Sequence, residues 1–186
     1  TLYEIGRLYE EQGNDVQAVA YYERSVAIAP KFLKGHEALA NLLRALGDRE
    51  GYLRHLRQAV RISPRNLERR FELGRAELHQ GDGSTAREVF KDILKEASSQ
   101  YSELAMQVGE ALLQMGAFPE AEEAFGKALV NDPVNLHVFN QLGIAFRRQG
   151  KYPEAVANYL RALKTAPSDE NLHYNVARAY FEMKNY

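Results

Sequence analysis

The stretch Leu142–Pro167, LGIAFRRQGKYPEAVANYLRALKTAP, holds two amphipathic segments joined by a short turn around Gly150. Counted from Gly150, a small residue follows at +5, an aromatic residue at +9, a small residue at +12 and a proline at +17. Similar patterns start at glycines spaced 34 or 35 residues apart, namely Gly13, Gly47, Gly81, Gly116 and Gly150. A fixed period of this length predicts a stacked array of similar units rather than one globular core.

Each unit is predicted to form two helices. In the first unit, apolar residues recur at helical spacing from Leu2 to Tyr9, which indicates one buried helical face. Gly13 should end the first helix, because glycine tolerates the left-handed conformation at a helix C-terminus. Pro30 should end the second helix, because proline lacks an N–H and disfavours helix in the residue before it. The sequence therefore predicts an all-α protein.

The period and the pattern of small and large residues resemble the tetratricopeptide repeat (TPR) family over essentially the whole chain. That family has a large and then a small residue at repeat positions 7 and 8, and an aromatic residue at position 24. Positions 7 and 8 read here Ile5-Gly6, Leu39-Ala40, Leu73-Gly74, Val108-Gly109, Leu142-Gly143 and Val176-Ala177. Position 24 reads Tyr22, Leu56, Phe90, Phe125 and Tyr159. The resemblance implies a right-handed superhelical solenoid of antiparallel helix pairs.

We expect one array of five repeats and the first helix of a sixth. The expected repeats are 1–32, 33–66, 67–101, 102–135 and 136–169, followed by the lone helix at 170–186. The chain starts at Thr1 inside a repeat and stops about half-way through another, so we expect it to be a piece of a longer protein. The apolar face of the last helix should then be exposed, which would allow self-association through the truncated ends.

Two residues depart from the expected pattern. Tyr52 occupies position 20, where the family has a small residue, so its helix should be displaced unless the neighbouring Gly51 absorbs the phenol ring. Glu77 occupies position 11, where the family has an apolar residue. We expect its stem to pack and its carboxylate to reach water or an arginine. The alternative interpretation of Glu77 is a buried functional acid.

Composition excludes several classes of protein. The chain has 186 residues, a net charge of −1, 45% hydrophobic residues, 26% charged residues and no cysteine. It has neither a membrane-length apolar run nor a signal-peptide pattern. The lack of cysteine removes disulfides and thiolate metal sites and fits a reducing compartment. We therefore expect a folded protein without a membrane span, located in the cytoplasm.

Signatures of catalysis are also absent. The sequence contains no HExxH, no GxSxG and no glycine-rich phosphate loop. The histidines are never three or four residues apart, so a metal site would need ligands from different repeats. His36 and His173 share repeat position 4, where packing is the expected role. We predict no catalytic residue, no metal site and no cofactor, and hence no enzymatic activity.

The resemblance implies that the first helix of each repeat lines a concave groove. Position 6 carries side-chain amides in three successive first helices, at Gln107, Gln141 and Asn175. Amides both donate and accept hydrogen bonds, so such a line can satisfy the backbone of an extended peptide. The full predicted groove set is Gln107, Asn140, Gln141, Arg147, Arg148, Asn171, Tyr174, Asn175 and Arg178. The alternative is that a solvent-facing position simply takes polar residues.

The family's clamp for a C-terminal carboxylate has no match here. The window starting in the first repeat ends in Glu68 and Glu72, where the clamp has basic residues. The pattern therefore argues against binding of chaperone tails by that route.

Charge is unevenly distributed along the chain. The segment 44–75 carries a net charge of +5, and the segment 77–132 carries −7. The basic segment holds a patch made of Arg54, Arg57, Arg61, Arg65, Arg69 and Arg70. This arginine patch is expected either to face an acidic partner or to form a solvated outer surface with local ion pairs. Nucleic-acid binding is not expected, because the total charge is not basic.

The sequence thus predicts a non-catalytic protein–protein interaction scaffold that binds a partner peptide or protein segment in its groove. One alternative is a regulatory or targeting arm of a larger bacterial signalling protein or enzyme, since ISPRNLERRFELGR is similar to TPR segments attached to bacterial response regulators. A second alternative is a scaffold that assembles with itself through its end faces.

Overall fold

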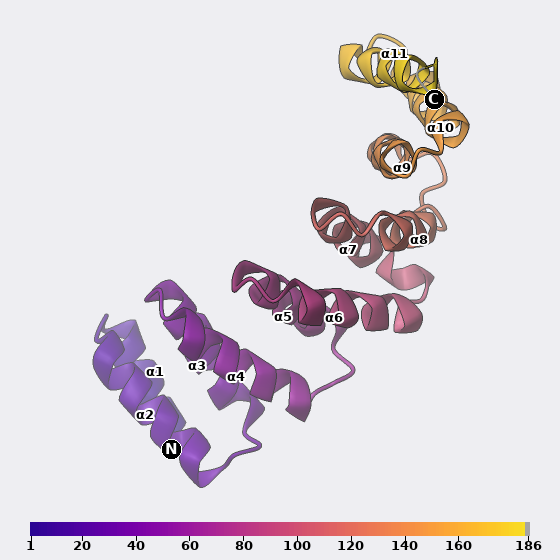
Figure 1. Ribbon diagram of the computed structural model, residues 1–186. Helices are drawn as coiled ribbons and strands as arrows, with labels where there is room; N and C mark the ends of the chain where they lie inside the picture. The colour runs from indigo at the N-terminus through magenta and orange to yellow at the C-terminus, as the bar shows by residue number, and fades with distance from the viewer. Residues whose placement is uncertain (185–186) are drawn as a thin grey trace. The chain divides into compact units, whose positions relative to one another are not determined.

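The structure, a computed structural model, describes residues 1–184, with Ser99 described by its backbone only. This part of the chain contains eleven α-helices and one 3-10 helix, and no strand (Figure 1). The helices are α1 (Leu2–Glu11), α2 (Asp15–Ile28), α3 (Leu33–Ala45), α4 (Arg49–Ile62), α5 (Leu67–His79), α6 (Gly83–Glu96), η1 (Ser99–Tyr101), α7 (Ser102–Gln114), α8 (Phe118–Ala128), α9 (Leu136–Arg148), α10 (Tyr152–Thr165) and α11 (Glu170–Lys184). The predicted all-α class is confirmed.

The chain divides into two compact units, Thr1–Val89 and Phe90–Tyr186, and α6 crosses the division. In unit 1, each helix from α1 to α5 packs against the next one along the chain. In unit 2, the same holds from α7 to α11, and η1 lies against α7 and α8. Each unit is therefore built from antiparallel pairs stacked in chain order.

The cores of the two units are local. Residues of α2 and α3 form one buried cluster in unit 1: Ala18, Tyr22, Val26, Leu39, Leu42 and Leu43. Residues of α3, α4 and α5 form the next: Ala40, Leu53, Leu56, Leu73 and Ala76. In unit 2, α9, α10 and α11 share Phe139, Ala155, Val156, Tyr159, Ala162, Leu172 and Ala179. Each cluster joins neighbouring helices only, as expected for stacked repeats.

The turn inside each pair has the same chemistry throughout. All five anchor glycines have positive φ angles, from 71° at Gly13 to 91° at Gly81, so the predicted left-handed turn is confirmed. A cap often follows: the Asn14 side chain accepts the N–H of Gln17, and Asp48 accepts that of Gly51. These caps satisfy backbone N–H groups that a helix start leaves unpaired.

Close packing within a pair depends on a glycine facing a ring. A Cβ atom added to Gly6 would lie 2.7 Å from the ring of Tyr22, and one added to Gly143 would lie 2.3 Å from Tyr159. In the second repeat the larger Ala40 shares a cluster with the smaller Leu56. The sizes at positions 8 and 24 therefore compensate for one another.

The two departures from the pattern lie in unit 1. A Cβ added to Gly51 would lie 2.9 Å from Leu43, so Gly51 allows α4 to approach α3 beside Tyr52. The displacement of α4 itself stays a prediction. Glu77 is 1% exposed, and Arg57 donates to both of its carboxylate oxygens at 2.7 and 2.8 Å. The expectation that the Glu77 carboxylate reaches an arginine is confirmed.

Candidate functional site

The amides predicted to line the groove lie on the first helices of unit 2. Gln107 is on α7, Gln141 on α9 and Asn175 on α11. These first helices contact one another directly, α7 with α9 and α9 with α11. One hydrogen bond joins the predicted set across repeats: Asn175 Nδ2 donates to Asn140 Oδ1 at 3.0 Å.

The asparagine pair has unused hydrogen-bonding groups. Each side-chain amide offers one oxygen acceptor and one NH₂ donor. The bond between Asn140 and Asn175 uses the oxygen of the first and the nitrogen of the second. Among residues 1–184, the Asn140 nitrogen and the Asn175 oxygen have no other partner. A donor and an acceptor are therefore available on neighbouring first helices, and both residues are only half-buried.

The two glutamines of the set have partners on the same helices. The Gln107 amide donates to Glu103, and the Gln141 amide nitrogen lies 3.4 Å from Nε2 of His137. His137 Nε2 in turn lies 2.6 Å from Glu110 Oε1, which joins α9 to α7. His137 and Glu110 were not in the predicted set, although they lie at repeat positions 2 and 9, where groove residues are expected.

The cationic members of the set are arranged differently from one another. Arg147 is buried, 7% exposed, and its Nη1 donates to both carboxylate oxygens of Glu182 at 2.9 and 3.1 Å. Arg178 Nε donates to the same carboxylate at 2.8 Å. Arg147 therefore links α9 to α11 instead of presenting a free charge. The remaining predicted residues, Arg148, Asn171 and Tyr174, are exposed.

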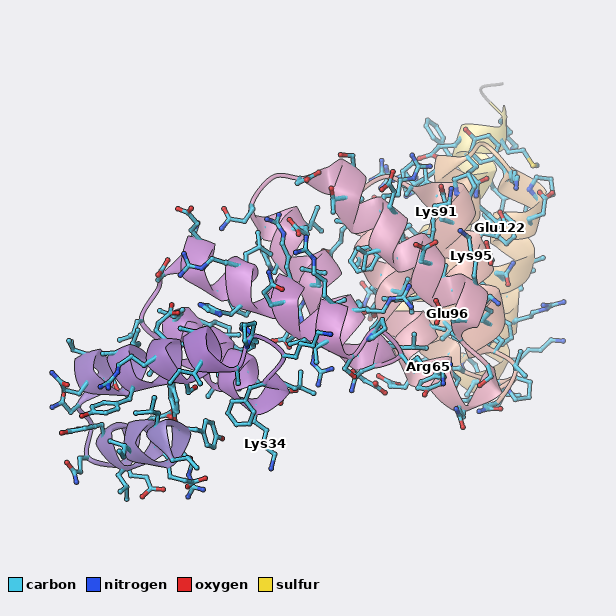
Figure 2. The ribbon with its side chains drawn as sticks, turned by 90° about the horizontal axis from the view of Figure 1, so that it is seen from below. Lys34, Arg65, Lys91, Lys95, Glu96 and Glu122 are labelled. Atoms are coloured by element: carbon cyan, nitrogen blue, oxygen red, sulfur yellow. The ribbon has the colours of Figure 1, made fainter. Side chains whose placement is uncertain are left out.

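Three residues of the arginine patch form ion pairs with acids of unit 1. Arg54 pairs with Glu23, Arg57 with Glu77 and Arg69 with Glu37. Two further arginines of the patch, Arg61 and Arg65, are exposed, and Arg65 is labelled in Figure 2. Arg70 completes the patch and is partly buried. A pocket of about 640 Å³ places Arg54, Arg57 and Arg61 beside Glu50, Glu77 and Asp82. The patch is therefore interleaved with acids.

A buried pair of histidines in unit 1 was missed by sequence reasoning. His36 on α3 and His55 on α4 lie with their Nδ1 atoms 3.0 Å apart, and both rings are buried. His36 Nε2 lies 3.1 Å from the Pro30 carbonyl, and His55 Nε2 lies 3.1 Å from Glu23 Oε1. The residues are 19 positions apart on the two helices of one repeat, so helical spacing could not reveal the contact.

The histidine chain requires a specific proton arrangement. His36 Nε2 must donate to Pro30, because a carbonyl oxygen only accepts. In the contact between the two rings, one Nδ1 donates and the other accepts. A neutral His55 ring can donate to the Glu23 carboxylate through Nε2–H and accept at Nδ1. Burial opposes a charge on His55 and lowers its pKa, although the nearby Glu23 partly offsets the effect and Arg54 adds to it.

We expect acid to destabilise the protein through His55. A histidine with a lowered folded-state pKa binds fewer protons folded than unfolded, so its contribution to stability is present above the unfolded pKa and lost as the pH falls. Lowering the pH from 7.5 to 5.5 should therefore reduce the free energy of unfolding through this residue. Urea unfolding at both pH values should show a smaller loss for His55→Gln than for the parent chain.

The matched control for this experiment is His173→Gln. His173 also bonds a proline carbonyl, that of Pro167, but it is exposed and its other ring nitrogen contacts no histidine in the described chain. This variant should lose as much stability on acidification as the parent does. An equal loss in the His55 variant and the parent would show that the buried ring has no role in the pH dependence.

Within residues 1–184, no three His, Asp or Glu side chains lie together as a group that could hold a metal ion. No helix in that range is long and apolar enough to cross a membrane.

Stacked helix pairs with a polar, partly unsatisfied face on their first helices define an α-helical repeat scaffold. Comparison with family models identifies the repeat: models of the tetratricopeptide repeat match residues 1–34 and 37–102, and a TPR repeat model matches 143–184. The chain belongs to the tetratricopeptide repeat family. The predicted family and the fold of antiparallel helix pairs are confirmed, and this family is a non-catalytic protein-interaction scaffold.

Similarity to individual proteins is more distant. The BBSome complex member BBS4 of Bos taurus is 28% identical over 114 residues, which are 61% of this chain and 22% of that protein. The chain thus spans about a fifth of the length of this relative.

Solved structures show the same fold at low identity. MamA is 20% identical with a TM-score of 0.68, covering 88% of both chains. YrrB, described as a TPR protein with an unusual peptide-binding site, is 16% identical with a TM-score of 0.70, covering 95% of this chain and 90% of that one. A tetratricopeptide repeat protein from Parabacteroides merdae is 19% identical with a TM-score of 0.68, covering 98% and 72%.

Proposed function

We propose that this chain binds an extended segment of a partner protein along the first helices of unit 2, with the segment's backbone held by Asn140 and Asn175. The observation that carries the proposal is the hydrogen bond between these amides, which leaves one donor and one acceptor unused on adjacent helices. A peptide backbone in extended conformation offers the complementary carbonyl and N–H groups. Because backbone groups are common to all sequences, the asparagine pair would supply affinity rather than sequence preference.

Selectivity in this proposal comes from the residues around the pair. Tyr174 and Asn171 on α11 are exposed and can contact side chains of the bound segment. Glu110 and His137 add a polar pair on α7 and α9. Arg147 is left out, because its guanidinium is buried against Glu182 and stabilises the stack of α9 and α11. The helices are ordered by their own packing, so the scaffold loses little conformational entropy on binding.

Peptides selected from a phage-displayed library on the intact chain provide the ligands for the test. The double variant Asn140→Ala/Asn175→Ala should bind the selected peptides about tenfold more weakly, because two hydrogen bonds of about 1 kcal/mol each are lost in part. Gln141→Ala should weaken them less, because its amide already lies beside His137. Isothermal titration calorimetry measures these affinities, and circular dichroism checks that helicity is unchanged.

Gln17→Ala is the control for amide removal, because Gln17 is exposed on α2 of unit 1. It should leave the affinity unchanged. Unaltered affinity in the double asparagine variant would refute this binding mode, whichever peptides are selected.

A second candidate function, self-association, is favoured by the exposed apolar residues of α11. Tyr174, Tyr180, Phe181 and Met183 are all exposed. Ala177 is exposed as well, whereas its counterpart Gly143 in the preceding repeat is buried beneath Tyr159. Sedimentation of the free chain over a range of concentrations separates the two functions. A mass that rises with concentration and returns to that of the monomer in Phe181→Glu would assign this face to contact between copies.

A further inference from the structure

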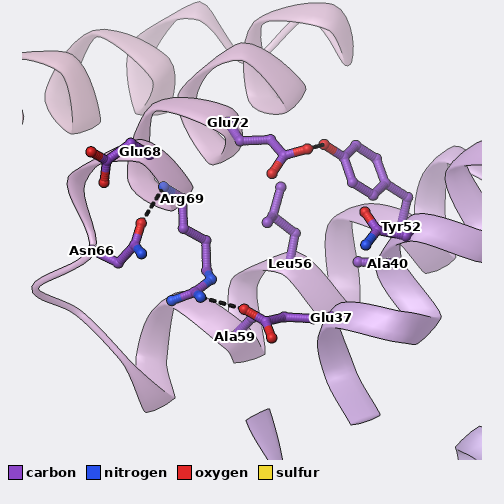
Figure 3. Close-up of a pocket in the computed structure, with 10 residues that line it drawn as sticks. Glu37, Ala40, Tyr52, Leu56, Ala59, Asn66, Glu68, Arg69 and Glu72 are labelled. Carbon is purple, nitrogen blue, oxygen red and sulfur yellow. Dashed lines mark hydrogen bonds and ion pairs between the residues drawn. The ribbon is translucent and has the colours of Figure 1, made fainter. Parts of the chain in front are cut away.

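We propose that unit 1 holds a pocket for a lysine or arginine side chain of a bound protein segment. The pocket has a volume of about 330 Å³ and lies between α3, α4 and α5 (Figure 3). It is separate from the asparagine pair of unit 2, so its existence does not depend on that pair. The pocket has an apolar floor, acidic walls and a donor without a partner. These suit, in turn, the methylene stem, the charged end and the main-chain carbonyl of a basic residue.

The floor of the pocket suits the methylene stem of a long cationic side chain. The floor is formed by Ala40, Leu56 and Ala59, and all three are buried residues of the hydrophobic core of unit 1. Figure 3 shows Leu56 between the acidic residues, with the ring of Tyr52 to one side. Lysine and arginine bury their stems on apolar surface while their charged ends remain among polar groups.

The walls of the pocket suit the charged end. Glu72 binds Tyr52 and Arg44 through one oxygen, Oε1, at 3.1 and 2.8 Å. Glu37 likewise binds Arg69 through its Oε1. In the described chain the Oε2 atoms of both carboxylates have no further partner, which leaves them available to an ammonium or guanidinium group.

Glu68 completes the acidic walls. It lines the same pocket, is exposed, and forms no hydrogen bond or ion pair with any described residue. Three glutamates face one arginine among the lining residues, so the pocket carries a net charge of −2. Arg44, which binds Glu72 from outside the lining, reduces this to −1 and does not reverse it. An anionic side chain or a C-terminal carboxylate would be repelled here.

A buried donor in the wall points to the backbone of the bound segment. Arg69 donates to Glu37 through Nη2, while its Nη1 is buried and has no hydrogen-bond partner. A buried donor without a partner costs free energy, and a carbonyl oxygen brought by a ligand would satisfy it. Arg69 therefore supplies the contact to the main chain beside the bound cationic side chain.

The groove continues beyond this pocket, which favours a segment over a free small cation. Glu37 and Asn41 also line a neighbouring open pocket of about 540 Å³ between α1 and α3. Asn41 is exposed and its amide has no partner among residues 1–184, so it can bond a backbone that passes from one pocket to the other. Lys34 lines the second pocket, and Figure 2 shows its side chain extending away from the ribbon. The lining of the second pocket, with Lys34 and Arg7 beside three glutamates, carries a net charge of −1, against −2 for the lining of the first.

The test uses four host peptides of glycine, alanine and serine that differ only in a central lysine, arginine, norleucine or glutamate. Each is titrated into the intact chain with labelled leucine methyl groups. The lysine and arginine peptides should shift the Leu56 methyl signals and bind up to about fivefold more tightly than the norleucine peptide, the gain expected from one ion pair. Glu68→Lys should abolish the difference without unfolding the chain, because Glu68 is exposed and has no partner to lose.

Glu123→Lys is the matched control, since Glu123 is an exposed glutamate on α8 in unit 2. It should leave the lysine peptide's affinity unchanged. The pocket is disproved by equal binding of the lysine and norleucine peptides, by lack of any Leu56 shift at millimolar peptide, or by full binding to the Glu68 variant. None of these results bears on the asparagine pair, whose variants are measured with a different set of peptides.

Discussion

Replacing Arg57 by alanine is expected to lower the free energy of unfolding by about 3 kcal/mol, because the substitution leaves a buried carboxylate without its counter-charge. Glu77 is almost completely buried on α5, and Arg57 on α4 donates to both of its oxygens. The arginine itself is about half exposed and can return to water, so the cost falls on Glu77. Urea unfolding of the variant, monitored by circular dichroism, measures the effect.

The control removes the carboxylate as well. Glu77→Leu places an apolar residue where other tetratricopeptide repeats have one, and we expect its stability to stay within about 1 kcal/mol of the parent, as for other buried pairs replaced by apolar residues. Adding Arg57→Ala to Glu77→Leu should then cost little. A cost for Arg57→Ala that persists in the Glu77→Leu background would mean that the arginine stabilises the fold by packing and not by neutralising Glu77.

Gly143→Ala is expected to destabilise the chain by about 2 kcal/mol, a typical cost of overpacking a filled core. The added Cβ would lie 2.3 Å from the ring of Tyr159, which is completely buried and cannot move aside without disturbing α10. Alanine would otherwise favour the helix over glycine, so a loss of stability isolates the steric clash. Thermal and urea unfolding of the variant provide the measurement.

Two companion variants define the cause. Gly126→Ala, on an exposed part of α8 where an added Cβ would meet nothing within 4 Å, should stabilise the chain by about 0.5 kcal/mol. The double variant Gly143→Ala/Tyr159→Leu has the same two residue types as Ala40 and Leu56 in the second repeat. Its loss of stability should therefore be smaller than the sum of the losses in the two single variants. Strict additivity would contradict the size compensation.

The fold was predictable because its determinants are local and repeated. A glycine that adopts a positive φ and a small residue that faces a large one recur every 34 or 35 residues. A proline follows four of the five second helices, and Ser98 stands in its place after α6. Each cluster of the core draws only on neighbouring helices, so short-range periodicity contained most of the needed information. For the irregular Glu77, the sequence predicted that the carboxylate reaches water or an arginine, and the structure provides Arg57.

The candidate sites were less predictable, because they depend on single contacts between repeats. Repeat positions placed Asn140 and Asn175 on one surface, but only coordinates show that they bond one another. Arg147 lies at a groove position and nevertheless folds inward onto Glu182. The contact of His36 with His55 and the bond from Tyr52 to Glu72 join residues 19 and 20 positions apart, and no simple spacing rule relates them. Pattern therefore predicts which face a side chain lies on, whereas rotamer and partner decide what it does there.

The confinement of every core cluster to adjacent helices has a consequence for how such proteins change in evolution. Since no buried residue in the described clusters relies on a distant part of the chain, duplicating or deleting one helical hairpin leaves the remaining hydrophobic contacts in place. The number of hairpins can thus vary by gene duplication while each retained hairpin keeps its own polar residues. A recognition surface of this type can acquire a new specificity in one added segment without redesign of the older ones.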